Sequence, residues 1–99
     1  MNEVVDEEII LFNILEELYE LNHSEWKKRV IEVLMEQDKA SYFKIKEKFL
    51  KIPDMLVYRC LRELILEGII VRESNKGKVS YRFTEEGRTL APILIDVEE

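Results

Sequence analysis

The sequence has only one cysteine and one histidine among its 99 residues. One cysteine cannot form an internal disulfide. A metal site would have to combine Cys60, His23 and carboxylates, yet neither residue has a neighbour at ligand spacing. There is also no run of about 18 uncharged apolar residues, and the first residues are acidic, so we expect neither a membrane span nor a secretory signal. These absences predict a cytoplasmic protein that binds no metal, cofactor or membrane.

Sequence motifs of common enzymes are missing as well. There is no G-x-S-x-G, phosphate-binding loop or H-E-x-x-H sequence. Acid pairs such as Glu7 with Glu8 and Glu85 with Glu86 lie in predicted helices, where adjacent side chains diverge by about 100° and cannot act on one atom. We therefore expect no enzyme. Abundant glutamate and lysine with a single glutamine are typical of heat-adapted proteins and suggest a thermophilic prokaryote as the source.

What is present predicts a mainly α fold with a small β-hairpin, in one domain spanning residues 1–99. Hydrophobic residues make up 46% of the chain and charged residues 36%, which excludes a disordered chain. Ser24, Ser41 and Thr84 are suited to cap helix N-termini, and Gly68 to end a helix. We expect helices at residues 6–22, 24–37, 41–50, 53–67 and 84–95, and strands at residues 69–73 and 79–84.

The net charge of -6 is unevenly distributed along the chain. Residues 1–38 contain 11 acidic and 3 basic residues, and residues 89–99 contain 3 acidic residues and no base. Between them, residues 39–88 contain 12 basic and 7 acidic residues, a net charge of +5. This division predicts opposite potentials on different faces, so an acidic protein can still present a basic surface.

The predicted helix 53–67 has an apolar face and a polar face. Val57, Cys60, Leu61 and Leu64 form the apolar stripe, which favours a core role for Cys60 over a sensor thiol. Arg59 and Arg62 lie on the opposite side and are suited to read guanine, while Tyr58 could contact a phosphate or a base edge. A short helix before it and a lysine-bearing hairpin after it predict a winged helix-turn-helix with its wing at residues 74–78.

The helix predicted at residues 6–22 has a wider apolar surface than packing on one core requires. Its apolar side chains spread over about 200° of the helical wheel, against about 100° for a single core-facing stripe. We infer a second apolar partner for this helix, namely another copy of the chain.

Three stretches carry a resemblance to a known family. Residues 61–64, residues 67–70 with Arg72, and residues 81–92 resemble the pattern LxELExxGLIxR…YxLTxxGxxLxP of HxlR-type winged-helix transcriptional regulators, relatives of the MarR group. Trp26 and the apolar residues after it resemble the family's second helix. The family's N-terminal cysteine is missing here, so redox sensing is not implied.

The resemblance implies a homodimeric, sequence-specific regulator bound to double-stranded DNA. Helices 6–22 and 84–95 would make the dimer, helix 53–67 would enter the major groove, and wing 74–78 would contact the phosphate backbone or minor groove. Together with the residue pattern, it predicts recognition-helix contacts from Asp54, Met55, Tyr58, Arg59 and Arg62, and phosphate or wing contacts from Ser41, Lys44, Lys48, Lys51, Asn75, Lys76 and Lys78.

An alternative use of the same scaffold is a protein-protein interaction adaptor without specific DNA binding. The acidic residues Asp54, Glu63 and Glu67 on helix 53–67 favour this alternative, because they would lie near phosphates. The sequence leaves a small-molecule effector, the operator and the sign of regulation open.

Overall fold

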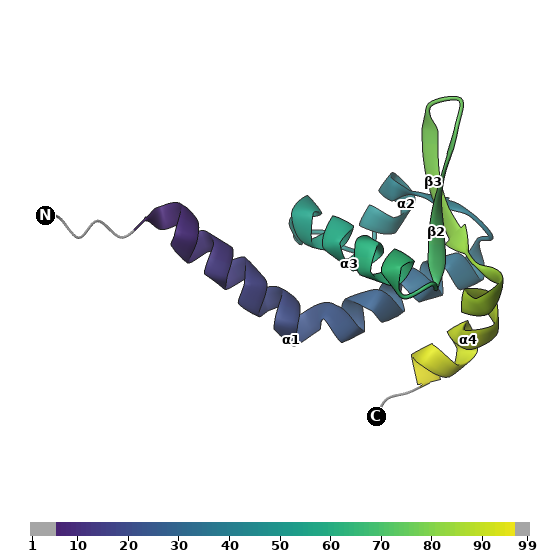
Figure 1. The fold of residues 1–99 in the computed structure, drawn as a ribbon, viewed down its shortest axis with the longest axis horizontal. Helices are drawn as coiled ribbons and strands as arrows, with labels where there is room; N and C mark the ends of the chain where they lie inside the picture. Colours follow the sequence, from purple (N-terminus) through teal and green to yellow (C-terminus); the bar gives the residue numbers. More distant parts are fainter. Residues whose placement is uncertain (1–5, 97–99) are drawn as a thin grey trace, which may run out of the picture.

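The computed structural model describes residues 6–96 and has the mainly α fold with a small β-sheet that the sequence predicts. The elements follow one another as α1 (Glu7–Glu36), β1 (Ala40–Ser41), α2 (Tyr42–Lys46), α3 (Asp54–Leu66), β2 (Ile70–Asn75), β3 (Lys78–Phe83) and α4 (Glu85–Asp96). Helices α2 and α3 form a helix-turn-helix, and the β2–β3 hairpin projects from the helical body as a wing (Figure 1).

Helix α1 is one continuous helix of 30 residues, not the two helices expected at residues 6–22 and 24–37. The helix runs through Asn22 and Ser24 without a break, and the Asn22 side-chain amide donates to the carbonyl of Leu18 one turn earlier. Tyr19 and Trp26 are both buried, with ring centroids 5.8 Å apart, so one packed stripe spans the expected break. Ser24 therefore lies inside the helix and does not cap it.

The first turns of α1 extend away from the rest of the molecule (Figure 1). Residues 7–14, which we call the α1 arm, are all exposed. The radius of gyration of 15.8 Å exceeds the value of about 13 Å typical of a compact chain of this length. The apolar side chains that the arm exposes are Ile9, Ile10, Leu11, Phe12 and Ile14.

The first helix of the helix-turn-helix is shorter than the predicted range 41–50. Ser41 caps it as expected, because its hydroxyl accepts from the backbone N–H of Lys44 at 3.2 Å. After Lys46 the backbone changes to hydrogen bonds three residues apart, from Lys48 to Ile45 and from Phe49 to Lys46. This tighter turn brings the Phe49 side chain into the core.

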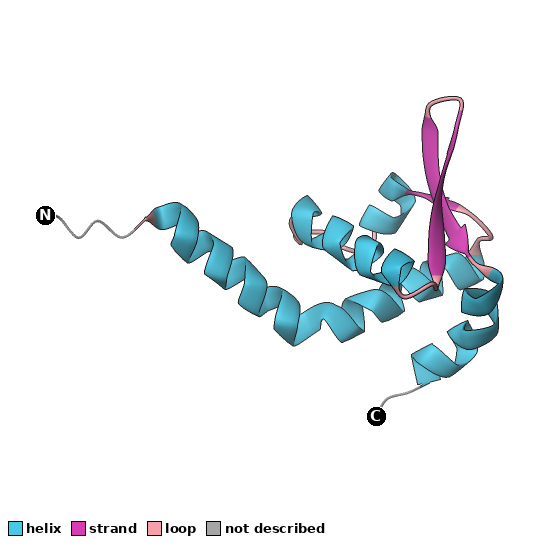
Figure 2. Ribbon diagram, viewed as in Figure 1, coloured by secondary structure: helices cyan, strands magenta, loops and turns pink. Residues whose placement is uncertain are grey.

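The sheet has the order β1-β3-β2, and both pairs of neighbours are antiparallel. Figure 2 shows the long hairpin of β2 and β3 in magenta. Strand β1 was not predicted, because two residues are too few to show an alternating pattern. Strands β2 and β3 are shifted from the predicted ranges 69–73 and 79–84, so the turn at the wing tip contains only Lys76 and Gly77.

The backbone at the end of α3 packs closely against the start of α4. Gly68 has φ +78°, and the N–H of Ile69 donates to the carbonyl of Leu64, which together end α3 as the sequence predicts. Thr84 caps α4, since its hydroxyl accepts from the N–H of Gly87 at 2.9 Å. A Cβ atom at Gly87 would lie 1.9 Å from the carbonyl oxygen of Ile69, so only glycine fits there without a shift.

Candidate nucleic-acid interface

Helix α3 divides into the two faces expected from its sequence. Val57, Cys60, Leu61 and Leu64 are buried, together with Leu56. The exposed stripe comprises Met55, Tyr58, Arg62 and Leu66, which follow one another at three- and four-residue spacing. Arg62 makes no ion pair with any of residues 6–96, so its guanidinium is available to an outside partner.

Arg59 lies at the edge of this stripe and turns toward α1. Its Nη1 atom is 2.8 Å from Oε2 of Glu16, and its Nε atom is 3.7 Å from Oε2 of Glu63. The guanidinium also stacks over the ring of Tyr19, 4.2 Å from the centroid. Arg59 is therefore held by three internal contacts, in contrast to Arg62.

The start of α3 is fixed to α2 by polar and aromatic contacts. The rings of Tyr42 and Tyr58 stack with centroids 4.4 Å apart and planes 9° apart. The Tyr42 hydroxyl donates to the Asp54 carboxylate, which lies 3.6 Å from the Lys46 ammonium. The hydrogen bond from Tyr42, with the charge of Lys46, lowers the pKa of Asp54, whereas burial and the same bond raise the pKa of Tyr42. Asp54 thus has partners within the helix-turn-helix.

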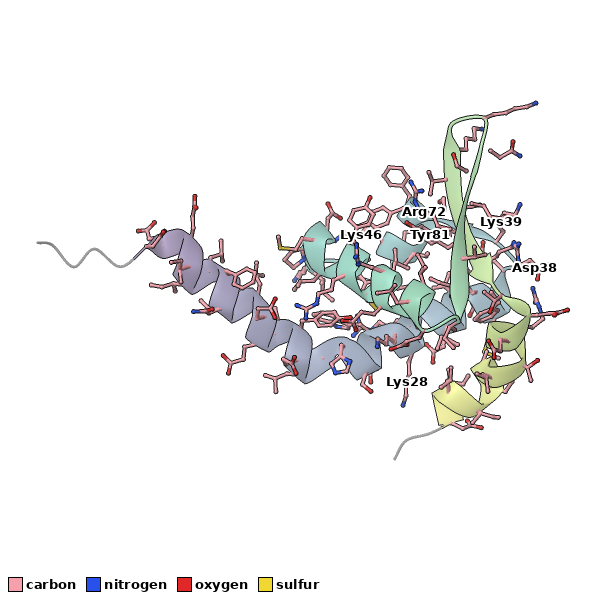
Figure 3. The ribbon with its side chains drawn as sticks, viewed as in Figure 1. Lys28, Asp38, Lys39, Lys46, Arg72 and Tyr81 are labelled. Carbon is pink, nitrogen blue, oxygen red and sulfur yellow. The ribbon has the colours of Figure 1, made fainter. Side chains whose placement is uncertain are left out.

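Lys46 was not among the predicted site residues, although it organises the turn between the two helices. Its ammonium donates to the backbone carbonyls of Phe49 and Ile52. Figure 3 labels it beside α2 and α3. The nearest signal in the sequence was the set of lysines predicted to contact phosphates, Lys44, Lys48 and Lys51, and Lys46 was not among them.

The wing ends in a two-residue turn that carries positive charge. Lys76 has φ +53° and Gly77 has φ +81°, the pair of left-handed conformations that a tight hairpin turn requires. Asn75 and Lys78 face each other as the last paired residues, and all four residues of the tip are exposed. The predicted wing residues are therefore together at the end of the hairpin.

The residues of α2 and the following turn that were predicted to contact phosphates form a less compact group than the wing residues. Ser41 pairs with Ser80 of β3, which brings the start of α2 beside the wing. Lys44 is 3.8 Å from the carboxylate of Glu47, whereas Lys48 and Lys51 are exposed. This group remains a prediction, since its side chains are surface lysines without a shared partner.

Arg72 is a second basic residue of this surface that was missed as a contact. It is exposed on β2 directly opposite Tyr81 of β3, and Figure 3 labels both at the base of the wing. Burial raises the pKa of Tyr81, and a hydrogen bond with Arg72 opposes that change. Arg72 lies on the same face of the sheet as the buried Ile70 and Tyr81, and the available signal was only a basic residue in the strand next to the predicted wing.

The acidic residues of α3 that favoured an adaptor are neutralised within the molecule. Lys27 of α1 is 3.2 Å from Glu63 and 2.8 Å from Glu67, and the Tyr19 hydroxyl donates to Glu63 at 2.9 Å. Partial burial opposes the ionised form of Glu63, but these hydrogen bonds and charges lower its pKa overall. Glu63 and Glu67 thus act as links between α1 and α3.

No residue cluster suited to a metal ion occurs within residues 6–96. Cys60 is fully buried, and burial raises the pKa of its thiol to about 12, as expected for a core residue. A cavity of about 440 Å³ lies between α1, the end of α3 and Leu94 of α4. Its wall carries the ion pair of Lys27 and Glu67, together with Lys28 and with His23, whose Nδ1 atom is buried without a hydrogen-bond partner among the described residues. No helix in the described chain is long and apolar enough to cross a membrane.

The chain is similar to a known helix-turn-helix family and to solved structures. A family model described as HxlR-like helix-turn-helix matches residues 21–99. The reduced form of the transcriptional regulator YodB from B. subtilis is 26% identical, with a TM-score of 0.64 over 82% of this chain and 81% of that chain.

Two further solved structures are similar in fold. Lactococcus lactis ZitR, as an apo-form mutant, has a TM-score of 0.61 and 22% identity over 93% of this chain and 70% of that chain. The F-93 protein of SSV1 has a TM-score of 0.60 and 19% identity over 72% of this chain and 82% of that chain. No curated protein matches the sequence.

Proposed function

The chain belongs to the HxlR-like helix-turn-helix family, and we propose that it is a transcriptional regulator that binds double-stranded DNA. The observation that carries this proposal is the exposed face of α3, with an arginine free of ion pairs within residues 6–96, beside a basic wing in a chain of this family. A helix anchored by its apolar side can enter the major groove, while lysines on a neighbouring hairpin contact phosphates.

Within this interface we assign different roles to the predicted residues. Arg62, Met55 and Tyr58 form the base-reading stripe, with Arg62 as the residue that hydrogen-bonds guanine. Asp54 and Arg59 have internal partners and contribute by holding α3 in place. The phosphate contacts come from exposed residues on α2, the following turn and the wing, namely Ser41, Lys44, Lys48, Lys51, Asn75, Lys76 and Lys78.

We further propose that the protein acts as a homodimer through its terminal helices. The α1 arm exposes a row of large apolar side chains that has no cover within residues 6–96, and Ile93 of α4 is exposed too. A two-fold pairing of such surfaces buries them and presents two copies of α3 to half-sites about one DNA turn apart.

The test is selection of bound sequences from a random DNA pool, followed by fluorescence-anisotropy titration of the recovered sequences. We expect a pseudo-palindromic motif, with binding that weakens steeply as salt is raised. Recovery of no shared motif, with no binding even at about 50 mM salt, would refute the proposal. The adaptor alternative would gain support from that result, although the internal pairing of Glu63 and Glu67 removes part of its basis.

A further inference from the structure

Helix α1 leaves the body of the domain at Leu15 and Glu16. Tyr19 and Trp26 are buried against the core, Leu15 and Glu16 are half-buried, and every residue of the α1 arm is exposed. The contact of Glu16 with α3 is therefore at the outer limit of the packing between α1 and the domain. Whatever holds Glu16 determines the direction in which the arm continues.

Arg59 of α3 is the residue that holds Glu16. The Nη1 atom of Arg59 and the Oε2 atom of Glu16 are 2.8 Å apart, as close as the Lys27–Glu67 pair at the end of α3. Stacking of the same guanidinium over Tyr19 adds a second contact to α1, one turn closer to the core. Two contacts on successive turns fix the helix in both direction and rotation.

The contact is supported by a row of alternating charges. From Glu16 the row continues through Arg59, Glu63, Lys27 and Glu67, with separations of 2.8, 3.7, 3.2 and 2.8 Å. The row crosses repeatedly between α1 and α3. To reach a base, Arg59 would have to leave Glu16 and the Tyr19 ring, whereas Arg62 is free of such contacts within residues 6–96.

We propose that Arg59 is a positioning residue, which through Glu16 sets the angle between the α1 arm and the recognition helix, and thereby the spacing of the two half-sites. The half-site part of this inference rests on the proposed function. Glu7 lies nine positions before Glu16, so the arm acts as a lever of about 14 Å. A small change of angle at Glu16 therefore displaces the dimer contact, and with it the partner's α3, by a much larger amount.

The first test measures the arm without DNA. Spin labels are attached to Asn13→Cys on the arm and Ser74→Cys on the wing, and Cys60 stays unlabelled because it is buried. After dilution into excess unlabelled protein, pulsed dipolar spectroscopy gives the distance within one chain. We expect one narrow distribution, which Glu16→Gln broadens.

The matched variants separate the ion pair from a general loss of charge. Arg59→Gln should broaden the distribution at least as much as Glu16→Gln does, because it removes the contacts with Tyr19 and Glu63 as well as the shared ion pair. Adding Glu16→Gln to Arg59→Gln should then change little. Glu17→Gln removes an exposed carboxylate that has no ion pair within residues 6–96, and it should leave the distribution unchanged. A distribution for Glu16→Gln identical to that of the unsubstituted chain would overturn the proposal.

The second test measures whether the angle between the α1 arm and α3 affects the spacing of the half-sites on DNA. In selections from DNA pools with variable spacers between the half-sites, the Glu16→Gln protein should recover the same half-site sequence. Its preference for one spacer length should be about two- to fivefold weaker than that of the unsubstituted chain, which is the size expected for one partly exposed ion pair. An unchanged spacing preference, with a broadened arm, would refute the link to half-site spacing. If the unsubstituted chain selects no motif, the proposed function fails, and the label distances alone still decide whether Arg59 positions the arm.

Discussion

Replacement of Gly87 by alanine tests how tightly α4 is docked on the end of α3. An ordinary contact to a Cβ atom begins near 3.4 Å, so the carbonyl oxygen of Ile69, 1.9 Å from the added atom, would have to move by about 1.5 Å. That oxygen accepts from the N–H of Thr84 at 3.0 Å and from its hydroxyl at 3.3 Å. The substitution should therefore weaken two hydrogen bonds as well as disturb the packing of α4 on the end of α3.

The expected loss of stability follows from opposing contributions. Overpacking in a closely packed site costs about 1–3 kcal/mol, and each weakened hydrogen bond costs about 1 kcal/mol. Alanine in place of glycine within a helix favours folding by about 1 kcal/mol, which offsets part of that cost. We expect Gly87→Ala to lower the free energy of unfolding by about 2 kcal/mol.

The assay is urea unfolding at one fixed protein concentration, followed by the fluorescence of Trp26, the single buried tryptophan. Gly77→Ala is the matched control, because Gly77 has φ +81° but open space around its Cβ position. It should cost only the backbone strain of about 1–2 kcal/mol, without loss of the α4 contact. A Gly87→Ala protein within about 0.5 kcal/mol of the unsubstituted chain would show that the clash is relieved without cost, against our reasoning.

Three other substitutions and one chemical treatment test the site, the dimer and the core. Arg62→Ala should weaken binding to selected DNA by about 1–3 kcal/mol more than binding to random DNA, whereas Lys78→Ala should weaken both alike and reduce the salt slope by about 1, both measured by anisotropy. Phe12→Asp should yield a monomeric mass in light scattering, and a persistent dimer would exclude the arm as the interface. Cys60 should resist a thiol-specific reagent at neutral pH until the protein unfolds, because its pKa is raised to about 12, and rapid modification of the folded protein would contradict its burial.

Much of the fold could be predicted because its signals are local. The apolar stripe of α3, the Ser41 and Thr84 caps and the left-handed Gly68 each depend on residues within one or two turns. The break expected at Ser24 was wrong because a serine that can cap a helix is also tolerated within one. The packing of Trp26 and Tyr19 on one core decided between the two, and that packing is not visible in the sequence.

The site was predicted less completely, because its contacts join distant parts of the chain. The helical wheel placed Arg59 and Arg62 on the same side of α3, but it contained no information on what faces each of them. Glu16, 43 residues earlier in the chain, distinguishes the two arginines. Lys46 was missed for a similar reason, since its partners are backbone carbonyls of a turn whose path only the fold defines.

The continuity of α1 makes the register of its residues as important as their identity. Because one unbroken helix joins the core around Trp26 to the exposed arm, each residue inserted between them would rotate the arm by about 100° about the helix axis. An insertion in a surface loop leaves the orientation of distant side chains unchanged, whereas here it would turn Phe12 and its apolar neighbours to another side. Length in this segment is therefore more tightly constrained than composition, and homologous chains can differ there by substitution far more readily than by insertion or deletion.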